Sequence, residues 1–310
     1  MKDKVLYPQA VIGTNSWGSG AYEKAMRGNA VGMEGFRATV DAARRNGITI
    51  FDTARDYGNG KCPKILGELA TDEICISSKY TPFRKYRKGQ VFDAVEKDLR
   101  DFQRNYIDIY WLHMPNDIEK NLEEIIALCK MGKIKHIGVS NFNLRECQKA
   151  KNILEAENIP LYGVQNHYSI LCRDWEQNGL IEWCHENGIL FWAWSSLEGG
   201  LLAGPVKISG IMGLFGKGKA KKFAPLYDVM GRIGETHDLC LSQVAISYCV
   251  TKGIVPMCGC RREQRVDELA RAIRVKLTES EIKEIDRVTE KYKMRNLGSD
   301  VFRFAVRKKQ

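Results

Sequence analysis

The chain has 310 residues, of which 44% are hydrophobic and 28% charged, and its formal net charge is +10. This composition is ordinary for a folded globular protein, and no apolar run approaches the ~18 residues that a membrane-spanning helix needs. The first residues, MKDKVLYPQAV, lack the hydrophobic segment of a secretion signal, so we expect a cytoplasmic protein. The ten cysteines include no Cys-x-x-Cys pair, which favours reduced thiols over disulfides or a metal site.

Short runs of β-branched and aromatic residues alternate with amphipathic helical patterns along the chain. Eight runs predict buried strands, at 10–17, 48–54, 74–80, 107–114, 136–141, 161–168, 189–197 and 253–259. Helical patterns follow most of them, at 34–47, 91–105, 122–133, 144–158, 175–188, 241–253 and 263–273. Strict alternation predicts a parallel sheet, and eight such units most simply close into a single-domain (β/α)8 TIM barrel. A doubly wound open sheet is the alternative fold.

Two segments fall outside this alternation. Residues 204–225 are rich in glycine and lysine and predict an inserted mobile loop after the seventh strand. Within them, GLFGKGKA resembles a phosphate-binding loop, but Ala220 stands where a magnesium-binding hydroxyl is needed, which argues against an NTPase. Residues 278–310 begin with the capping-box pattern TESE, which predicts a final helix before a basic tail.

Four polar residues follow the ends of consecutive predicted strands. Asp52 ends the second strand, Tyr57 lies in the glycine-bounded turn after it, Lys79 ends the third strand and His113 the fourth. In a barrel, the carboxyl ends of the strands converge on one face, and that face carries the chemistry. We therefore expect these four side chains to surround one spot and to be catalytic.

These four groups together suit proton transfer. A phenol titrates near ~10, which is too high for efficient proton donation at neutral pH, so we expect a neighbouring Lys79 to lower the pKa of Tyr57. Asp52 is expected to keep a buried Lys79 charged. His113, as a neutral hydrogen-bond donor, is expected to contact and orient a substrate carbonyl. Each residue alone would more often be structural, and only their joint order indicates an enzyme.

Longer motifs occur in series along the same strands. They are GITIFDTARDYGNG, SSKY, YIDIYWLH, GKIKHIGVSNF, VQNHYS and AWSSLEGGLLAG. In order and spacing they resemble the signature blocks of the aldo-keto reductase family, over roughly residues 10 to 290. The resemblance implies a (β/α)8 barrel, a nicotinamide cofactor and a catalytic tetrad of Asp52, Tyr57, Lys79 and His113.

The same resemblance implies where the cofactor is held. The implied cofactor-binding residues are Ser16, Asp52, Ser140, Asn141, Gln165, Trp194, Ser195, Leu197, Gly199, Gly259, Arg261 and Arg265. In this set Ser140, Asn141 and Gln165 match the positions that bind the carboxamide, and Trp194 replaces a tyrosine that stacks on the nicotinamide ring. The segment from Ser195 to Gly199 matches the part that wraps the pyrophosphate, over which we also expect the 204–225 loop to close. Arg265 matches an arginine near the adenosine phosphate.

Other interpretations of these positions stay open, and some residues depart from the family pattern. Asn141 could instead cap the next helix, and Trp194 could belong to the core. Cys62 and Pro63 stand where the family commonly has Ser-Glu, and Leu269 replaces an asparagine that contacts adenine. Trp17 falls at a substrate-pocket position.

The leading functional hypothesis is an NADPH-dependent oxidoreductase that reduces an aldehyde or ketone to the alcohol, or runs the reverse reaction. NADH is the less favoured cofactor, and no metal is expected. The alternative is a cofactor-sensing binding subunit that resembles channel-auxiliary proteins. The basic residues are not interleaved with aromatic residues, so a nucleic-acid partner is not expected, nor is a membrane. The sequence leaves open the physiological substrate and the oligomeric state.

Overall fold

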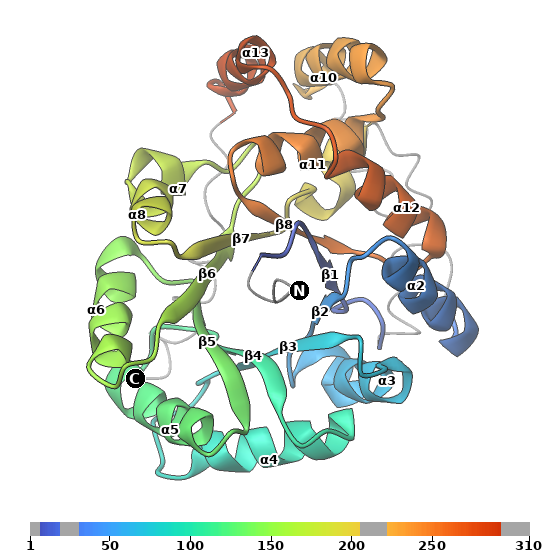
Figure 1. Cartoon of the computed structure of the whole chain (residues 1–310). Helices are drawn as coiled ribbons and strands as arrows, with labels where there is room; N and C mark the ends of the chain where they lie inside the picture. The colour runs from blue at the N-terminus through green and yellow to red at the C-terminus, as the bar shows by residue number, and fades with distance from the viewer. Residues whose placement is uncertain (1–6, 19–30, 205–221, 293–310) are drawn as a thin grey trace.

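Eight parallel strands form a closed barrel in the computed structural model, which describes residues 7–18, 31–204 and 222–292 (Figure 1). The strands are β1 (Val11–Gly13), β2 (Ile50–Asp52), β3 (Cys75–Tyr80), β4 (Ile107–Leu112), β5 (Ile134–Ser140), β6 (Leu161–His167), β7 (Leu190–Trp194) and β8 (Val255–Gly259). Each strand pairs with its neighbours in chain order, and Ile12 of β1 lies opposite both Phe51 of β2 and Cys258 of β8. This closure confirms the (β/α)8 barrel and excludes the doubly wound alternative.

Helices surround the barrel (Figure 1). They are α2 (Met33–Arg45), α3 (Lys61–Leu69), α4 (Gln90–Phe102), α5 (Ile118–Lys130), α6 (Leu144–Glu155), α7 (Asp174–Gln177), α8 (Leu180–Glu186), α10 (Ala224–His237), α11 (Leu241–Thr251), α12 (Glu263–Ala272) and α13 (Glu279–Thr289), with the 3-10 segments η1 (Tyr57–Gly60) and η2 (Glu198–Ala203). Helices α10 and α13 lie outside the ring that the others form around the barrel, beyond α11 (Figure 1). The helix predicted over 175–188 is divided, because Gly179 adopts a left-handed φ of 79° between α7 and α8. Across the described ranges, no helix is long and apolar enough to cross a membrane.

Helices α6 and α13, both predicted from the sequence, begin with complete capping boxes. At α6, the Asn143 side chain accepts a hydrogen bond from the Glu146 amide at 2.9 Å, and the Glu146 carboxylate accepts one from the Asn143 amide at 2.8 Å. The same arrangement of Thr278 and Glu281 begins α13, as the TESE pattern predicts. Residues 293–310, the basic tail, lie outside the described residues.

Two helices, α3 and α10, were not predicted. Of the expected 204–225 loop, residues 205–221 lie outside the described part of the chain, and its last two residues already belong to α10. Proline near the first turn begins α10, because its missing N–H is one that a helix start leaves unpaired anyway. The buried residues Leu226, Val229, Met230 and Ile233 give this helix its apolar face.

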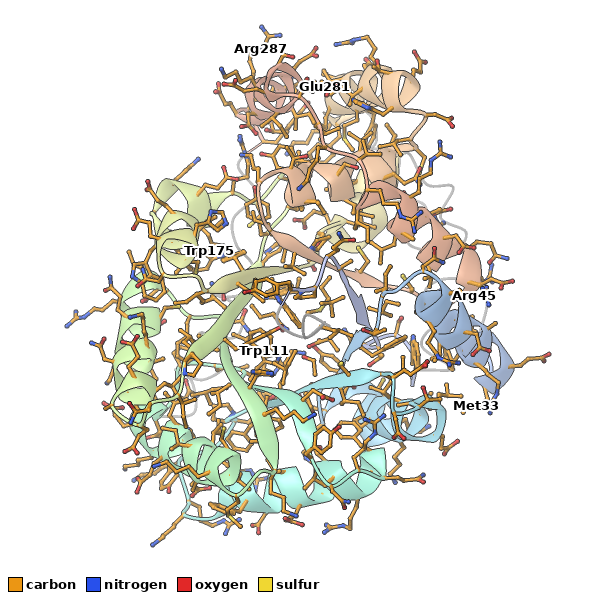
Figure 2. All side chains as sticks on the ribbon, in the orientation of Figure 1. Met33, Arg45, Trp111, Trp175, Glu281 and Arg287 are labelled. Atoms are coloured by element: carbon orange, nitrogen blue, oxygen red, sulfur yellow. The ribbon has the colours of Figure 1, made fainter. Side chains whose placement is uncertain are left out.

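Large side chains fill the interior of the barrel. The central cluster consists of Val11, Ile50, Ile109, Trp111, Tyr162, Trp192 and Val255. Trp111 lies at the middle of the barrel (Figure 2), with its ring centroid 4.8 Å from that of Trp192. Gly138 makes room for it, because a Cβ at that position would overlap the Trp111 indole. The interior is thus packed with side chains, so the chemistry must lie at the strand ends.

Candidate active site

Asp52 and Lys79 form a buried ion pair at the carboxyl end of the barrel. Lys79 Nζ donates to Asp52 Oδ2 and, at 2.9 Å, to the Thr53 carbonyl. The other oxygen, Asp52 Oδ1, accepts hydrogen bonds from Ser77 Oγ at 2.7 Å and Gln165 Nε2 at 3.1 Å. Burial lowers the pKa of Lys79, and the Asp52 carboxylate opposes that shift. The predicted contact between lysine and aspartate is therefore present.

Tyr57 lies beside this pair. Lys79 Nζ is 5.3 Å from the centroid of the phenol ring, within the range of a cation–π interaction. The pKa of Tyr57 is nevertheless raised well above its usual value of about 10, first by burial and then by the carboxylates of Asp52 and Asp56. The expected lowering of this pKa is wrong for this structure, because burial and the two carboxylates raise it. The phenol accordingly keeps its proton at neutral pH.

The turn that carries Tyr57 depends on glycine. Gly58, Asn59 and Gly60 have φ values of 58°, 57° and 81°, in the left-handed region. A Cβ on Gly58 would also lie 2.9 Å from Cys62 Sγ and from the Cα of Gly18. Cys62 is fully buried, and its thiol lies 3.6 Å from the Asn15 carbonyl. The Cys-Pro pair that departs from the family pattern thus lies in the first turn of α3, and Cys62 connects the turn to the segment after β1.

His113 lies just after β4 with 7% of its surface exposed. Its amide donates to the Tyr80 carbonyl at 2.9 Å, and its Nδ1 lies 2.7 Å from Thr81 Oγ1. Burial, together with the Lys79 charge, lowers the pKa of His113 to about 3. The imidazole is therefore neutral at physiological pH, as the sequence analysis expects.

Side chains at the ends of β5, β6 and β7 form a connected group. Ser140 Oγ donates to the Gln165 carbonyl at 2.8 Å, and Asn141 Nδ2 donates to the His113 carbonyl at 3.0 Å. Trp194 Nε1 donates to Asn141 Oδ1 at 3.2 Å. Asn143, not Asn141, caps α6, so the capping interpretation of Asn141 is wrong. The structure thus brings together all the residues expected at the carboxamide.

A group of residues that no sequence pattern indicated packs against Trp194. The imidazole of His167 stacks on the indole, with ring centroids 4.6 Å apart and planes 17° apart. Glu198 Oε1 lies 2.9 Å from His167 Nε2 and accepts a hydrogen bond from Ser169 Oγ at 2.5 Å. Glu198 belongs to η2. These contacts therefore connect the imidazole that packs against the indole with residues 195–199, which are expected to bind the pyrophosphate.

The segment after β7 has an unusual backbone. Ser195 and Glu198 have φ values of 58° and 49°, and Gly199 and Gly200 follow with 65° and 101°. Left-handed residues that are not glycine cost energy, and they cluster at functional sites. Among the described residues, no atom lies within 4 Å of a Cβ built on either glycine. Leu197 is partly buried and packs against the core. This open turn leaves space for a ligand beside the backbone.

The remaining residues expected to bind the cofactor lie after β1 and between β8 and α12. Gly259, at the end of β8, is exposed, whereas Arg261 and Ser16, which follows β1, are partly exposed. Arg265 is exposed, and its Nη1 lies 2.5 Å from Glu268 Oε2. Leu269 is a buried core residue, so its side chain is not presented to a ligand.

The structure places Trp17 in the core. Only 3% of its surface is exposed, and its indole stacks on Phe36 with a centroid distance of 4.8 Å. Its Nε1 donates to the Cys260 carbonyl at 2.8 Å. These contacts do not support the expected role in substrate binding.

The fold is a (β/α)8 barrel, and its strand ends carry a buried Asp-Lys pair, a tyrosine and a neutral histidine. These features together are typical of a barrel enzyme. A model of the aldo/keto reductase family matches residues 10–290, so the chain belongs to that family. Family membership confirms the expected enzyme class, an oxidoreductase that uses a nicotinamide cofactor.

Individual relatives agree with this assignment. The chain is 26% identical over 295 residues to the chloroplastic pyridoxal reductase of Arabidopsis thaliana, covering 87% of this chain and 80% of the relative. The crystal structure of the thermostable aldo-keto reductase Tm1743 superposes with a TM-score of 0.74 at 26% identity, covering 91% of this chain and 95% of that one. An aldo-keto reductase from Klebsiella pneumoniae, at 21% identity, shares the fold with a TM-score of 0.73, covering 94% of each chain.

Proposed function

We propose that this protein uses NADPH to reduce an aldehyde or ketone to the corresponding alcohol, with Tyr57 as the general acid. The observation that carries the proposal is the buried Asp52–Lys79 pair, which places an ammonium group 5.3 Å from the centroid of the Tyr57 ring. Family membership supports the reaction type, and the Arabidopsis thaliana relative is named a pyridoxal reductase. The Klebsiella pneumoniae structure contains NADPH, which supports the choice of cofactor.

The residues at the strand ends fit such a cofactor. The partly exposed indole of Trp194 provides a flat apolar surface, and Ser140, Asn141 and Gln165 provide hydroxyl and amide groups beside it. Gly199 and Gly200 leave space for phosphates to approach the backbone, where N–H groups in a left-handed turn suit an anion. NADPH, when bound, supplies the hydride that adds to the carbonyl carbon.

Tyr57 then supplies the proton that the carbonyl oxygen needs. Because burial raises the pKa of the phenol, the side chain holds its proton until the oxygen becomes basic. The phenolate that remains lies next to the Lys79 ammonium, and this opposite charge stabilises it. Asp52 holds Lys79 in place, and His113 orients the carbonyl. In the reverse direction, the same groups accept the proton from an alcohol.

Consumption of NADPH by the purified protein, with 4-nitrobenzaldehyde as the carbonyl substrate, tests this proposal. Turnover is expected for the wild type, and Lys79→Met should lose most of it, because the phenolate then lacks its cation. Tight binding of NADPH without turnover of any aldehyde, ketone or alcohol in a broad screen would contradict the proposal. That result would favour the alternative of a cofactor-sensing binding subunit.

A further inference from the structure

The position of the proton on His113 decides what the imidazole can do for a substrate. The ring is buried and neutral, so one ring nitrogen carries a proton and donates, while the other can only accept. A ring that holds its proton on Nδ1 has no proton on Nε2 to give to a carbonyl oxygen. The group that contacts Nδ1 therefore selects between a useful and a useless form.

Thr81 lies within hydrogen-bonding distance of Nδ1. It directly follows β3, and its Oγ1 lies 2.7 Å from His113 Nδ1. The neighbouring Tyr80 carbonyl accepts a hydrogen bond from the His113 amide at 2.9 Å. This bond between the ends of β3 and β4 keeps Thr81 and His113 next to each other. Asp56, in the turn before Tyr57, offers a second acceptor to the same hydroxyl, at 3.3 Å and 3.5 Å from its two oxygens.

A threonine hydroxyl has one proton, which leaves two arrangements. In the first, Thr81 donates to Nδ1, and the imidazole proton lies on Nε2. In the second, Nδ1–H donates to Thr81, and the hydroxyl donates to Asp56. Hydrogen bonds from a hydroxyl to a carboxylate are usually ~2.5–2.7 Å long, so both contacts to Asp56 are weak. The 2.7 Å contact to Nδ1 is present in both arrangements, so they differ in where the hydroxyl proton lies. In the first it lies in this short contact, and in the second it lies in a long contact to Asp56. The weakness of the long contact favours the first arrangement.

We propose that Thr81 is a positioning residue, which donates to His113 Nδ1 and so keeps the imidazole proton on Nε2, where it can serve a substrate carbonyl. The catalytic benefit rests on the proposed reductase function, but the location of the proton does not. Asp56 is exposed, and water can satisfy its carboxylate without the Thr81 proton.

The experiment compares Thr81→Val, which has a similar shape but no hydroxyl, with Thr81→Ser, which restores the hydroxyl. Proton-coupled ¹⁵N NMR of protein labelled at histidine reports the tautomer, and His113→Gln identifies the His113 resonances. Wild type and Thr81→Ser should show the proton on Nε2 and a hydrogen-bonded Nδ1. In Thr81→Val the Nδ1 resonance should move, whereas Asp56→Asn should leave the tautomer unchanged.

Turnover of an aldehyde provides the second readout. Loss of one hydrogen bond that orients the ring should lower kcat/KM roughly tenfold in Thr81→Val, with recovery in Thr81→Ser and little change in the Kd for NADPH. A wild-type spectrum with the proton on Nδ1, or an unchanged Nδ1 resonance in Thr81→Val, would overturn the proposal. Inactivity of the wild type toward every carbonyl would count against the proposed reaction alone, because the tautomer is measured without turnover.

Discussion

The imidazole of His167 covers one face of the Trp194 indole, at a centroid distance of 4.6 Å and an angle of 17° between the planes. The indole N–H donates a hydrogen bond to Asn141 Oδ1 at 3.2 Å. The ring is therefore held by the imidazole on one face and by this hydrogen bond at its edge. A tyrosine at this position would have no N–H to give to Asn141. The indole is thus fixed in one orientation before any ligand stacks on it, which reduces the entropy lost on binding.

Trp194→Phe should weaken cofactor binding. The variant keeps an aromatic ring but loses the bond to Asn141, which is worth about 1 kcal/mol, so the Kd for NADPH should rise roughly fivefold by calorimetry. Trp175→Phe is the matched control, because the buried Trp175 Nε1 has no hydrogen-bond partner among the described residues. An unchanged Kd in Trp194→Phe, or an equal rise in both variants, would show that the contact with Asn141 does not prepare the ring.

The neutral His113 should make the fold sensitive to acid. The pKa of His113 is about 3 in the folded protein, against 6.5 for an unperturbed histidine. Between these two pH values, the unfolded chain therefore binds one more proton at His113 than the folded chain does. The stabilisation that neutral His113 gives to the fold is lost as the pH falls from about 6.5 toward about 3. At about pH 5 the loss relative to neutral pH should be roughly 2 kcal/mol, from about 1.4 kcal/mol per pH unit.

Urea unfolding of wild type and His113→Asn, at neutral pH and at about pH 5, measures this contribution. Because other groups also titrate in this range, the quantity compared is the difference between the two proteins. The free energy of unfolding should fall less in the variant. His185→Asn, which replaces an exposed histidine of α8, controls for the loss of a histidine in general. Equal acid sensitivity of wild type and His113→Asn would argue against a histidine that is neutral because of burial.

Arg265 should determine the preference for NADPH over NADH. Its ion pair with Glu268 is exposed and so contributes little, which lets the guanidinium turn to a ribose 2′-phosphate. A bond to a phosphate is worth about 1.5–3 kcal/mol, so Arg265→Ala should weaken NADPH binding roughly tenfold to hundredfold. Binding of NADH should hardly change. Arg271→Ala, at the far end of α12, removes an exposed arginine that pairs with Asp238 and serves as the control. An unchanged ratio of the two affinities in Arg265→Ala would exclude this role.

The barrel was predictable because each of its strands is an apolar run of its own, followed by a helix or a turn. The strand ends were predictable for the same reason, and Asp52, Lys79 and His113 lie where the runs stop. Helix α10 was missed, although its apolar residues recur with helical spacing and Pro225 marks its beginning. Because the residues before it are rich in glycine, the predicted loop extends past the beginning of this helix.

Two other contacts between distant segments could not be predicted in this way. His167 and Glu198 lie 31 positions apart, and Thr81 and His113 lie 32 apart, so no local pattern joins them. The direction of the Tyr57 pKa shift depends on burial and on the nearby carboxylates of Asp52 and Asp56, which only coordinates give. Trp17 matched a substrate-pocket position in the family pattern, but the neighbouring Phe36 of α2 stacks on it.

Tyr57→Phe tests the role of Tyr57 as the proton donor, because it removes the hydroxyl that would donate the proton and keeps the ring beside Lys79. Turnover of an aldehyde should fall by ~10²-fold or more, while the Kd for NADPH stays close to that of the wild type. Tyr106→Phe is the matched control, since Tyr106 precedes β4 at the opposite end of the barrel and packs against Lys135. Turnover by Tyr57→Phe that is close to wild type, with NADPH still consumed in proportion to the alcohol formed, would contradict the assignment of Tyr57 as the general acid.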